Sequence, residues 1–278
     1  MHCNAFILLV LFLSFFNLPI LSYDLNQANI NVWLSAAAYC DKEAYSTMKL
    51  AGPATGFIVK EILYDKKTDV EGYIGILPSA KSIHVVIRGS SSVRNWIDDF
   101  IVVKTPYATF PECECEVHEG FYIATSSLSN ITISTVLKLL FENPTYNVIC
   151  TGHSLAASIA ALLALELKTF GIESSVYNYG QPRLGDQQFA TFLNTQLLHY
   201  WRFTHDNDIV PHVPPMKMKY IHSCGEVFEN ESGELRECSL TDCEDITCAD
   251  KYSALDVNSD AHSVYLGHFM ACNTSTIM

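Results

Sequence analysis

Apolar and polar positions alternate along this chain in blocks that predict helices and strands in turn. A helical face is expected where apolar side chains recur every three or four residues, and short apolar runs between turn residues predict strands. Helices are expected at residues 24–39, 121–141, 154–170 and 186–197, and strands at 56–64, 70–77, 83–87, 147–151, 176–179 and 199–204. The first two strands lie on either side of a polar turn and predict an antiparallel pair. The alternation that follows predicts an α/β fold with a parallel sheet and right-handed crossovers.

A serine lies at one junction of strand and helix, in the sequence Thr151-Gly-His-Ser154-Leu-Ala156. In this context a G-x-S-x-G turn lifts the serine hydroxyl clear of the sheet, and the helix N-terminus behind it offers unpaired N–H groups to an oxyanion. Ala156 departs from the pattern because it replaces the last glycine. The motif predicts a nucleophile and an α/β-hydrolase fold, and the alternative is a serine in an ordinary turn.

A nucleophilic serine needs a base and an orienting acid, and in this fold the three follow in the order Ser, Asp, His. The strand at 199–204 runs into Asp206 and Asp208, which both lie where a parallel sheet carries its chemistry. Asp208 is favoured because the apolar residues Ile209 and Val210 beside it predict a buried carboxylate. Position alone does not choose among the later histidines, which are His212, His222, His262 and His268.

The N-terminal residues 1–22 are predicted to be a signal peptide. From Phe6 to Leu21 the chain is almost wholly apolar, and this run is too short for a comfortable membrane span. A retained N-terminal anchor is the alternative. We expect residues 23–278 to form one α/β domain with no later transmembrane segment. The protein is then secreted, or lies in the lumen of a secretory or digestive compartment.

The chain is acidic, with a formal net charge of −13 at pH 7. The predicted signal peptide contains no Asp, Glu, Lys or Arg, so its removal leaves this charge unchanged. A surface of this sign repels nucleic acid and anionic membranes. The composition therefore excludes nucleic acid as a partner and favours a neutral substrate or a neutral lipid surface.

The chain has ten cysteines, a number that indicates an oxidising compartment. Cys3 leaves with the signal peptide, and Cys150 lies in the strand before the serine, where a buried free thiol is expected. The other cysteines are even in number and allow up to four bridges. Three N-glycosylation acceptor sequences are consistent with secretion, and they begin at Asn130, Asn230 and Asn273.

Several stretches of the chain resemble the fungal-type class 3 lipase family, which includes triacylglycerol lipases, some phospholipases A1 and feruloyl esterases. These stretches are Ser35–Cys40, Arg88–Ser90 with Asn95–Ile97, Val117–Phe121, Thr151–Leu155, Tyr179–Arg183, Asn207–Pro211 and Ala261–Tyr265. They follow one another in the family's order over nearly the whole mature chain. The resemblance implies an α/β-hydrolase fold, with a mostly parallel central sheet flanked by helices and a short helical lid.

The resemblance also implies a role for each candidate residue. Ser154 is the implied nucleophile, Asp208 the orienting acid and His262 the general base. Leu155 and Ser90 are implied to supply the two N–H groups of an oxyanion hole. No cofactor and no metal is implied. The remaining nearby candidates are then interpreted as structural or solvated, and they are Asp206, His118, His153, His205 and His212.

The segment after Ser90 corresponds to the lid of the resembled lipases. Its apolar residues fall at the spacing of one helical face, and they are Val93, Trp96, Ile97 and Phe100. An amphipathic lid can shield an apolar site in water and turn its apolar face toward a lipid interface. The alternative is an ordinary amphipathic helix that packs on the core.

Some of the cysteine pairs also follow from the resemblance. It implies a bridge between Cys40 and Cys272 near the two chain ends. Cys113 and Cys115 fall where relatives have a local bridge, but only one residue separates them, so either could pair elsewhere. Four cysteines lie in an acidic region without a clear match, where two bridges are expected and a calcium or zinc site is the alternative; they are Cys224, Cys238, Cys243 and Cys248.

Together these features predict a secreted serine ester hydrolase that cleaves acylglycerol ester bonds through an acyl-enzyme. A lipid or small ester substrate, a transient lipid–water interface and a monomeric state are expected. Alternatives among enzymes are a phospholipase A1 and a feruloyl-type carboxylesterase. A non-catalytic lipid-binding relative is the alternative from another class, and the presence of all three triad residues argues against it.

Overall fold

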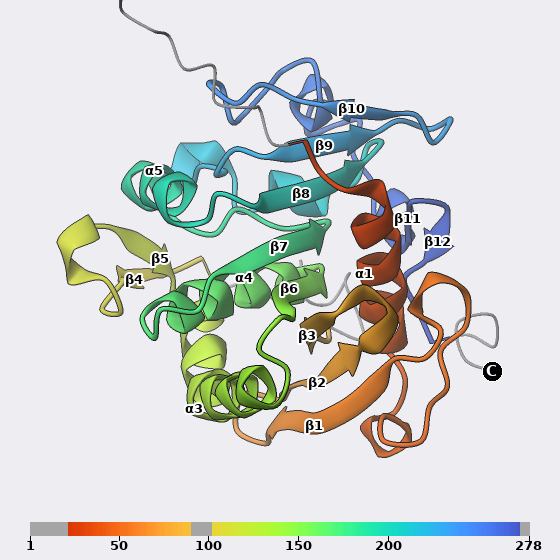
Figure 1. Cartoon of the computed structure of the whole chain (residues 1–278). Coiled ribbons are helices and arrows are strands. Elements are labelled where there is room, and N and C mark those ends of the chain that lie inside the picture. Colours follow the sequence, from red (N-terminus) through yellow and green to blue (C-terminus); the bar gives the residue numbers. More distant parts are fainter. Residues whose placement is uncertain (1–21, 90–101, 273–278) are drawn as a thin grey trace, which may run out of the picture.

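The computed structural model describes residues 22–89 and 102–272, which fold around an eight-stranded sheet (Figure 1). The strands lie in the order β1-β2-β3-β6-β7-β8-β9-β10. Their bounds are β1 Ile58–Asp65, β2 Val70–Leu77, β3 Ser82–Ile87, β6 Asn147–His153, β7 Ser174–Tyr179, β8 Tyr200–His205, β9 Glu226–Glu229 and β10 Leu235–Glu237. Strands β3, β6, β7, β8 and β9 pair in parallel, whereas β1, β2 and β10 pair antiparallel at the two edges. The expected mostly parallel α/β sheet is confirmed.

Helices cover both faces of this sheet (Figure 1). One face carries α1 (Leu25–Ala37), and the other carries α3 (Glu119–Glu142), α4 (Leu155–Lys168) and α5 (Gln187–Gln196). Strand β6 explains the arrangement, since its side chains alternate between the faces. Val148 and Cys150 join the core beneath α4, and Ile149 between them packs in the cluster that contains residues of α1.

Helix α3 is long and apolar enough to cross a membrane by length and composition, whereas the sequence predicted no transmembrane segment after residue 22. Its most apolar window has a mean hydropathy of 1.2 and is 39% buried. The buried side chains include Phe121, Leu128 and Leu139, which belong to the same core cluster as α4 and the sheet. A helix that packs in a protein core passes the same test, so α3 is weak evidence for a membrane span.

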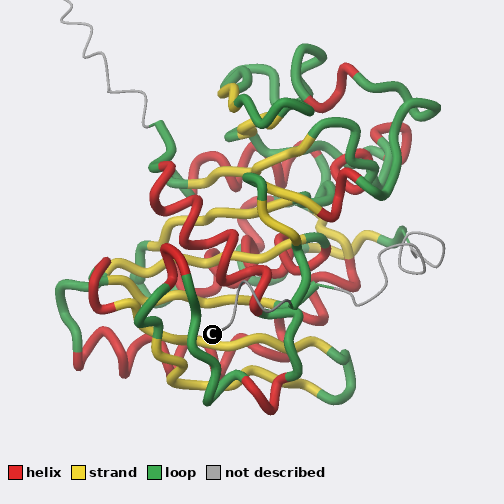
Figure 2. Tube along the Cα trace, turned by 90° about the vertical axis from the view of Figure 1, so that its right-hand side faces the viewer, coloured by secondary structure: helices red, strands yellow, loops and turns green. Residues whose placement is uncertain are grey.

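Several short strands were not predicted from the sequence. They form two small hairpins and the far edge of the sheet, and the hairpin strands are β4 Lys104–Pro106, β5 Glu116–His118, β11 Val264–Tyr265 and β12 His268–Phe269. Each is too short for a hydrophobic period to be recognised. After β10 the chain runs mostly in turns and loops. Figure 2 shows a large group of loops at the top of the molecule, above the strands of the sheet.

Four disulfide bonds link the described residues, and they join Cys40 to Cys272, Cys113 to Cys115, Cys224 to Cys243 and Cys238 to Cys248. The two neighbouring cysteines pair with each other and not elsewhere. The cysteines of the acidic region form two bridges, so their sulfurs are not available as thiolate ligands for a metal. Cys150 is free and buried, and burial raises the pKa of its thiol to about 12.

Some predicted features lie outside the described residues. They are the signal peptide, the oxyanion residue Ser90, the lid residues Val93, Trp96, Ile97 and Phe100, and the acceptor Asn273.

Candidate active site

The turn between β6 and α4 holds Ser154. Its backbone angles, φ 65° and ψ −138°, lie in a region that residues with a side chain rarely adopt. The Ser154 N–H donates to the carbonyl of Tyr179 at 2.9 Å, which ties the turn to the end of β7. The serine is fully buried, and its Oγ has no hydrogen-bond partner in the described part of the chain. A strained serine between a strand and a helix is the arrangement that the G-x-S-x-G motif predicts.

The two small residues of the motif have different surroundings. A Cβ on Gly152 would lie 2.5 Å from the carbonyl oxygen of Ala156, so the turn requires glycine there. Ala156 is itself completely buried, and it belongs to the core cluster on the α4 side of the sheet. The departure from the last glycine of the motif is therefore accommodated by core packing.

His262 and Asp208 form a buried pair. The Nδ1 atom of His262 lies 2.7 Å from Oδ2 of Asp208, and both side chains are at most 2% exposed. The other carboxylate oxygen accepts the N–H of Val210 at 2.8 Å. The Nε2 atom of His262 is buried without a hydrogen-bond partner among the described residues. This is the arrangement of a general base whose ring is oriented by an acid and whose second nitrogen is open to a proton.

Ser154 and His262 both lie against the end of β7. The carbonyl of Tyr179 accepts the Ser154 N–H, and the next residue, Gly180, lies against the His262 ring. A Cβ on Gly180 would be 2.7 Å from Cε1 of His262, and the positive φ of 57° independently favours glycine. One short stretch of backbone therefore contacts both groups.

Two loops carry Asp208 and His262, and hydrogen bonds join these loops. Asp208 follows β8, and His262 lies in a short 3₁₀ turn, Ala261–Ser263. Asn258 accepts the N–H of Ile209 and donates its own to Asn207, both at 3.0 Å. These contacts hold together residues that are more than fifty positions apart.

The alternative candidates lie elsewhere. Asp206 accepts a hydrogen bond from the Tyr252 hydroxyl and does not pair with His262. The Nε2 atom of His222 donates to the carbonyl of Pro211 at 2.7 Å. The His268 ring stacks on Trp33 with centroids 4.3 Å apart. Among the candidates in the described residues, the structure brings Asp208 and His262 together.

The predicted oxyanion hole is described in part. Leu155 is the first residue of α4, so its N–H is one of the unpaired donors of a helix N-terminus. The second expected donor, Ser90, comes three residues after the end of β3 and lies outside the described ranges.

Tyr265, for which the sequence predicts no role, lies beside Asp208. Its hydroxyl donates to Oδ2 of Asp208, the oxygen that also contacts His262. Burial, with the nearby charge of Asp208, raises the pKa of Tyr265 far above its ordinary value, so the phenol remains a donor. The residue ends the stretch Ala261–Tyr265 that matched the family, and that position was the available signal.

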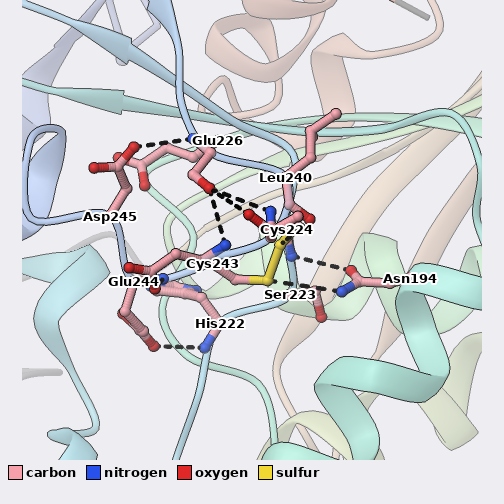
Figure 3. The surroundings of a disulfide bond; sticks show 12 residues. Asn194, His222, Ser223, Cys224, Glu226, Leu240, Cys243, Glu244 and Asp245 are labelled. Atoms are coloured by element: carbon pink, nitrogen blue, oxygen red, sulfur yellow. Dashed lines mark hydrogen bonds between the residues drawn. A yellow bond between two sulfur atoms is a disulfide. The ribbon is translucent and has the colours of Figure 1, made fainter. Parts of the chain in front are cut away.

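Glu244 lies beside the Cys224–Cys243 bond (Figure 3) and belongs to a buried ionic cluster. Arg183 donates two hydrogen bonds to Glu244, at 2.8 and 2.7 Å, and contacts Asp250 at 3.2 Å. The pKa of Asp250 is raised to about 7, chiefly by burial and then by its contact with Glu244. One arginine thus holds two carboxyl groups from the disulfide-linked loops against the sheet.

Two of the predicted glycosylation acceptors are described. Asn130 is exposed on α3. Asn230 is partly buried in the turn after β9, and its side chain bonds to Glu234 and to the N–H of Ser232.

Comparison with known proteins identifies the family. A model of the family described as Lipase (class 3) matches residues 84–218. The lipase of Rhizomucor miehei is 37% identical over 243 residues, which cover 82% of this chain and 65% of that protein. The secreted mono- and diacylglycerol lipase A of Penicillium cyclopium is 34% identical over 177 residues, which cover 63% of this chain and 57% of that protein. The matched region is thus less than two thirds of either relative's length.

A solved structure extends the comparison to the fold. It is that of a triacylglycerol lipase whose catalytic centre is formed by a serine protease triad. The two structures align with a TM-score of 0.80 at 29% identity, over 88% of this chain and 95% of the other. The chain has the α/β-hydrolase fold and belongs to the class 3 lipase family.

Proposed function

We propose that this protein is a serine ester hydrolase in which Ser154, His262 and Asp208 form the catalytic triad. The observation that carries the proposal is the buried His262–Asp208 pair, with its open Nε2 atom, against the same short stretch of backbone, Tyr179–Gly180, that the strained serine contacts. We also propose that residues 23–278 form a single domain.

The mechanism follows from these positions. Ser154 Oγ attacks the ester carbonyl while His262 Nε2 takes its proton, and Asp208 stabilises the imidazolium that forms. The Leu155 N–H, with Ser90, stabilises the oxyanion; loss of one such donor costs about 100- to 1000-fold in rate. His262 then protonates the leaving alcohol. Water, activated by the same base, hydrolyses the acyl-enzyme and regenerates Ser154.

We propose acylglycerols as the substrate class and an extracellular location. The relatives support both, since one is a secreted mono- and diacylglycerol lipase and another is a triacylglycerol lipase. The amphipathic pattern at Val93–Phe100 and the net charge of −13 favour a neutral lipid over an anionic one. The chemistry requires no cofactor.

The test is a hydrolysis panel on purified protein. We expect hydrolysis of tributyrin and of a long-chain triacylglycerol emulsion, and no activity in Ser154→Ala, which loses one hydroxyl and keeps the fold. An organophosphonate should label the wild type at Ser154. Full activity in the variant would overturn the triad. Preference for phosphatidylcholine or methyl ferulate would replace the acylglycerol assignment with a phospholipase A1 or a feruloyl-type esterase.

A further inference from the structure

A chain of hydrogen bonds runs from the end of α1 to the backbone of the general base. The Tyr39 hydroxyl lies 2.6 Å from Nδ1 of His153, and Nε2 of His153 lies 2.9 Å from the carbonyl oxygen of His262. The triad mechanism uses neither Tyr39 nor His153, although His153 is the residue next to the nucleophile.

The chemistry of the three groups gives each bond one direction. A carbonyl oxygen can only accept, so His153 Nε2 carries a hydrogen and donates to His262. Burial, with the neighbouring His262, holds the pKa of His153 well below its usual range, so the ring is neutral. A neutral imidazole that donates from Nε2 accepts at Nδ1. The Tyr39 hydroxyl is therefore the donor of the first bond.

The positions of these residues follow from the sheet. Ile149, Thr151 and His153 alternate along β6 and share the face that α1 covers. Thr151 Oγ1 lies 3.0 Å from Oγ of Ser35, four residues before Tyr39. The contacts of Thr151 and His153 thus fix the C-terminal end of α1 against the strand that leads to Ser154.

The ring of His153 also supports the ring of the base. The centroids of His153 and His262 are 4.2 Å apart, with an interplanar angle of 31°. Tyr39 is next to Cys40, whose bond to Cys272 ties this end of α1 to the C-terminal segment. The support is therefore attached to rigid elements and not to a free loop.

We propose that Tyr39 and His153 are positioning residues for His262: the tyrosine hydroxyl selects the His153 tautomer that donates to the His262 carbonyl, and the bond holds the imidazole in line with both Asp208 and Ser154. This inference rests on the proposed function. A base displaced by about 1 Å can lose about 100-fold in rate, so such support has a measurable effect.

Two substitutions of His153 separate positioning from mere packing. His153→Gln places an amide N–H near the position of Nε2, from which it can donate to the His262 carbonyl. His153→Asn is too short to reach that carbonyl but keeps a partner for Tyr39. Tyr39→Phe is a third variant, which removes only the hydroxyl that selects the tautomer.

The readout is kcat and KM on a soluble p-nitrophenyl ester, per active site titrated with an organophosphonate. We expect His153→Asn to lose about 100-fold in kcat with little change in KM, His153→Gln to recover most of that loss, and Tyr39→Phe to lose about 10-fold. Melting temperatures are measured in parallel, because a purely structural role would lower stability and the titrated fraction while kcat per site stayed unchanged.

Wild-type kcat per site in both His153→Asn and Tyr39→Phe would overturn the inference, as would equal losses in the Gln and Asn variants. If His153→Asn does not fold, Tyr39→Phe decides alone: a loss per site supports the inference and none refutes it. Ser154→Ala, measured beside them, tests the proposed function separately. If that variant stays active the triad is wrong, whereas an inactive Ser154→Ala with unaffected His153 and Tyr39 variants refutes only the positioning role.

Discussion

The bond between Asp208 and His262 gives a prediction whose size follows from the structure. Asp208→Asn removes the negative charge that faces His262 Nδ1 at 2.7 Å and keeps the volume of the side chain. The carboxylate is 1% exposed, so water cannot replace it. The Tyr265 hydroxyl and His262 Nδ1 share Oδ2, so the amide oxygen of the variant is expected at that position, and its NH₂ group would then face the Val210 N–H that now donates to Oδ1. The ring of His262 keeps its tautomer in that arrangement, and the variant loses the negative charge that would stabilise the imidazolium.

The expected loss can be estimated from Coulomb's law. His262 becomes an imidazolium in the transition state, and with an effective dielectric constant of about 20 its attraction to a carboxylate about 3 to 4 Å away is roughly 4 to 6 kcal/mol. Each 1.36 kcal/mol is tenfold in rate, so kcat should fall by about 10³- to 10⁴-fold. KM should change little, because the charge is stabilised only during the reaction.

The assay is hydrolysis of a soluble p-nitrophenyl ester, with Asp206→Asn as the matched control. Asp206 carries the same functional group two residues away and bonds to Tyr252, so its substitution should leave kcat within about threefold. The double variant Asp208→Asn with Ser154→Ala should be no slower than Ser154→Ala alone, since triad residues act as a unit. A larger loss in Asp206→Asn, or a loss below tenfold in Asp208→Asn, would refute the assignment of the acid.

Three further predictions concern stability and the lid. Replacing Cys40 and Cys272 together by Ser removes a disulfide whose cysteines are 232 residues apart. The free energy of unfolding should fall by about 5 kcal/mol and the melting temperature by roughly 10 to 20 °C, and an unchanged melting temperature would contradict the loop-closure argument. Asp250 has a raised pKa of about 7, so its contribution to stability is complete below the ordinary aspartate pKa near 4 and is lost as the pH rises through about 7. Between about pH 5.5 and 8 the free energy of unfolding of the wild type, measured with denaturant, should therefore fall by about 2 kcal/mol, whereas that of Asp250→Asn should not. Parallel pH profiles of the two proteins would contradict the burial of this acid beside Glu244. Trp96→Ser should lose activity on triacylglycerol droplets but retain most of it on a soluble ester, because only a lipid interface covers the apolar face of the predicted lid and so stabilises its open form. Equal losses on both substrates would indicate a core residue.

Much of the site could be predicted from local sequence. The strand, the Gly152–Ser154 turn and the helix that begins at Leu155 are adjacent, so backbone chemistry alone indicates a nucleophile. The alternation of strands and helices was likewise enough for the parallel sheet. The short strands β4, β5, β11 and β12 were not predicted, because a segment of two or three residues is too short to show a hydrophobic period.

Local sequence favoured Asp208 through its apolar neighbours but left Asp206 as an alternative, because both follow the same strand. The structure separates them: Asp206 bonds to Tyr252, whereas Asp208 is buried against His262. Similarly, the four cysteines of the acidic region allow three pairings, and loop packing selects one.

By itself the sequence determined the nucleophile turn, the fold class and a short set of candidates for the acid and the base. Only the tertiary structure decided which candidates meet, and it also placed Tyr39, His153 and Tyr265 around the base. The physical reason is distance along the chain. Backbone geometry and hydrophobic periods reflect only a few neighbouring residues, whereas Asp208 and His153, the partners of His262, lie 54 and 109 positions away from it. Their meeting depends on sheet order, on loop hydrogen bonds and on a disulfide that closes nearly the whole domain.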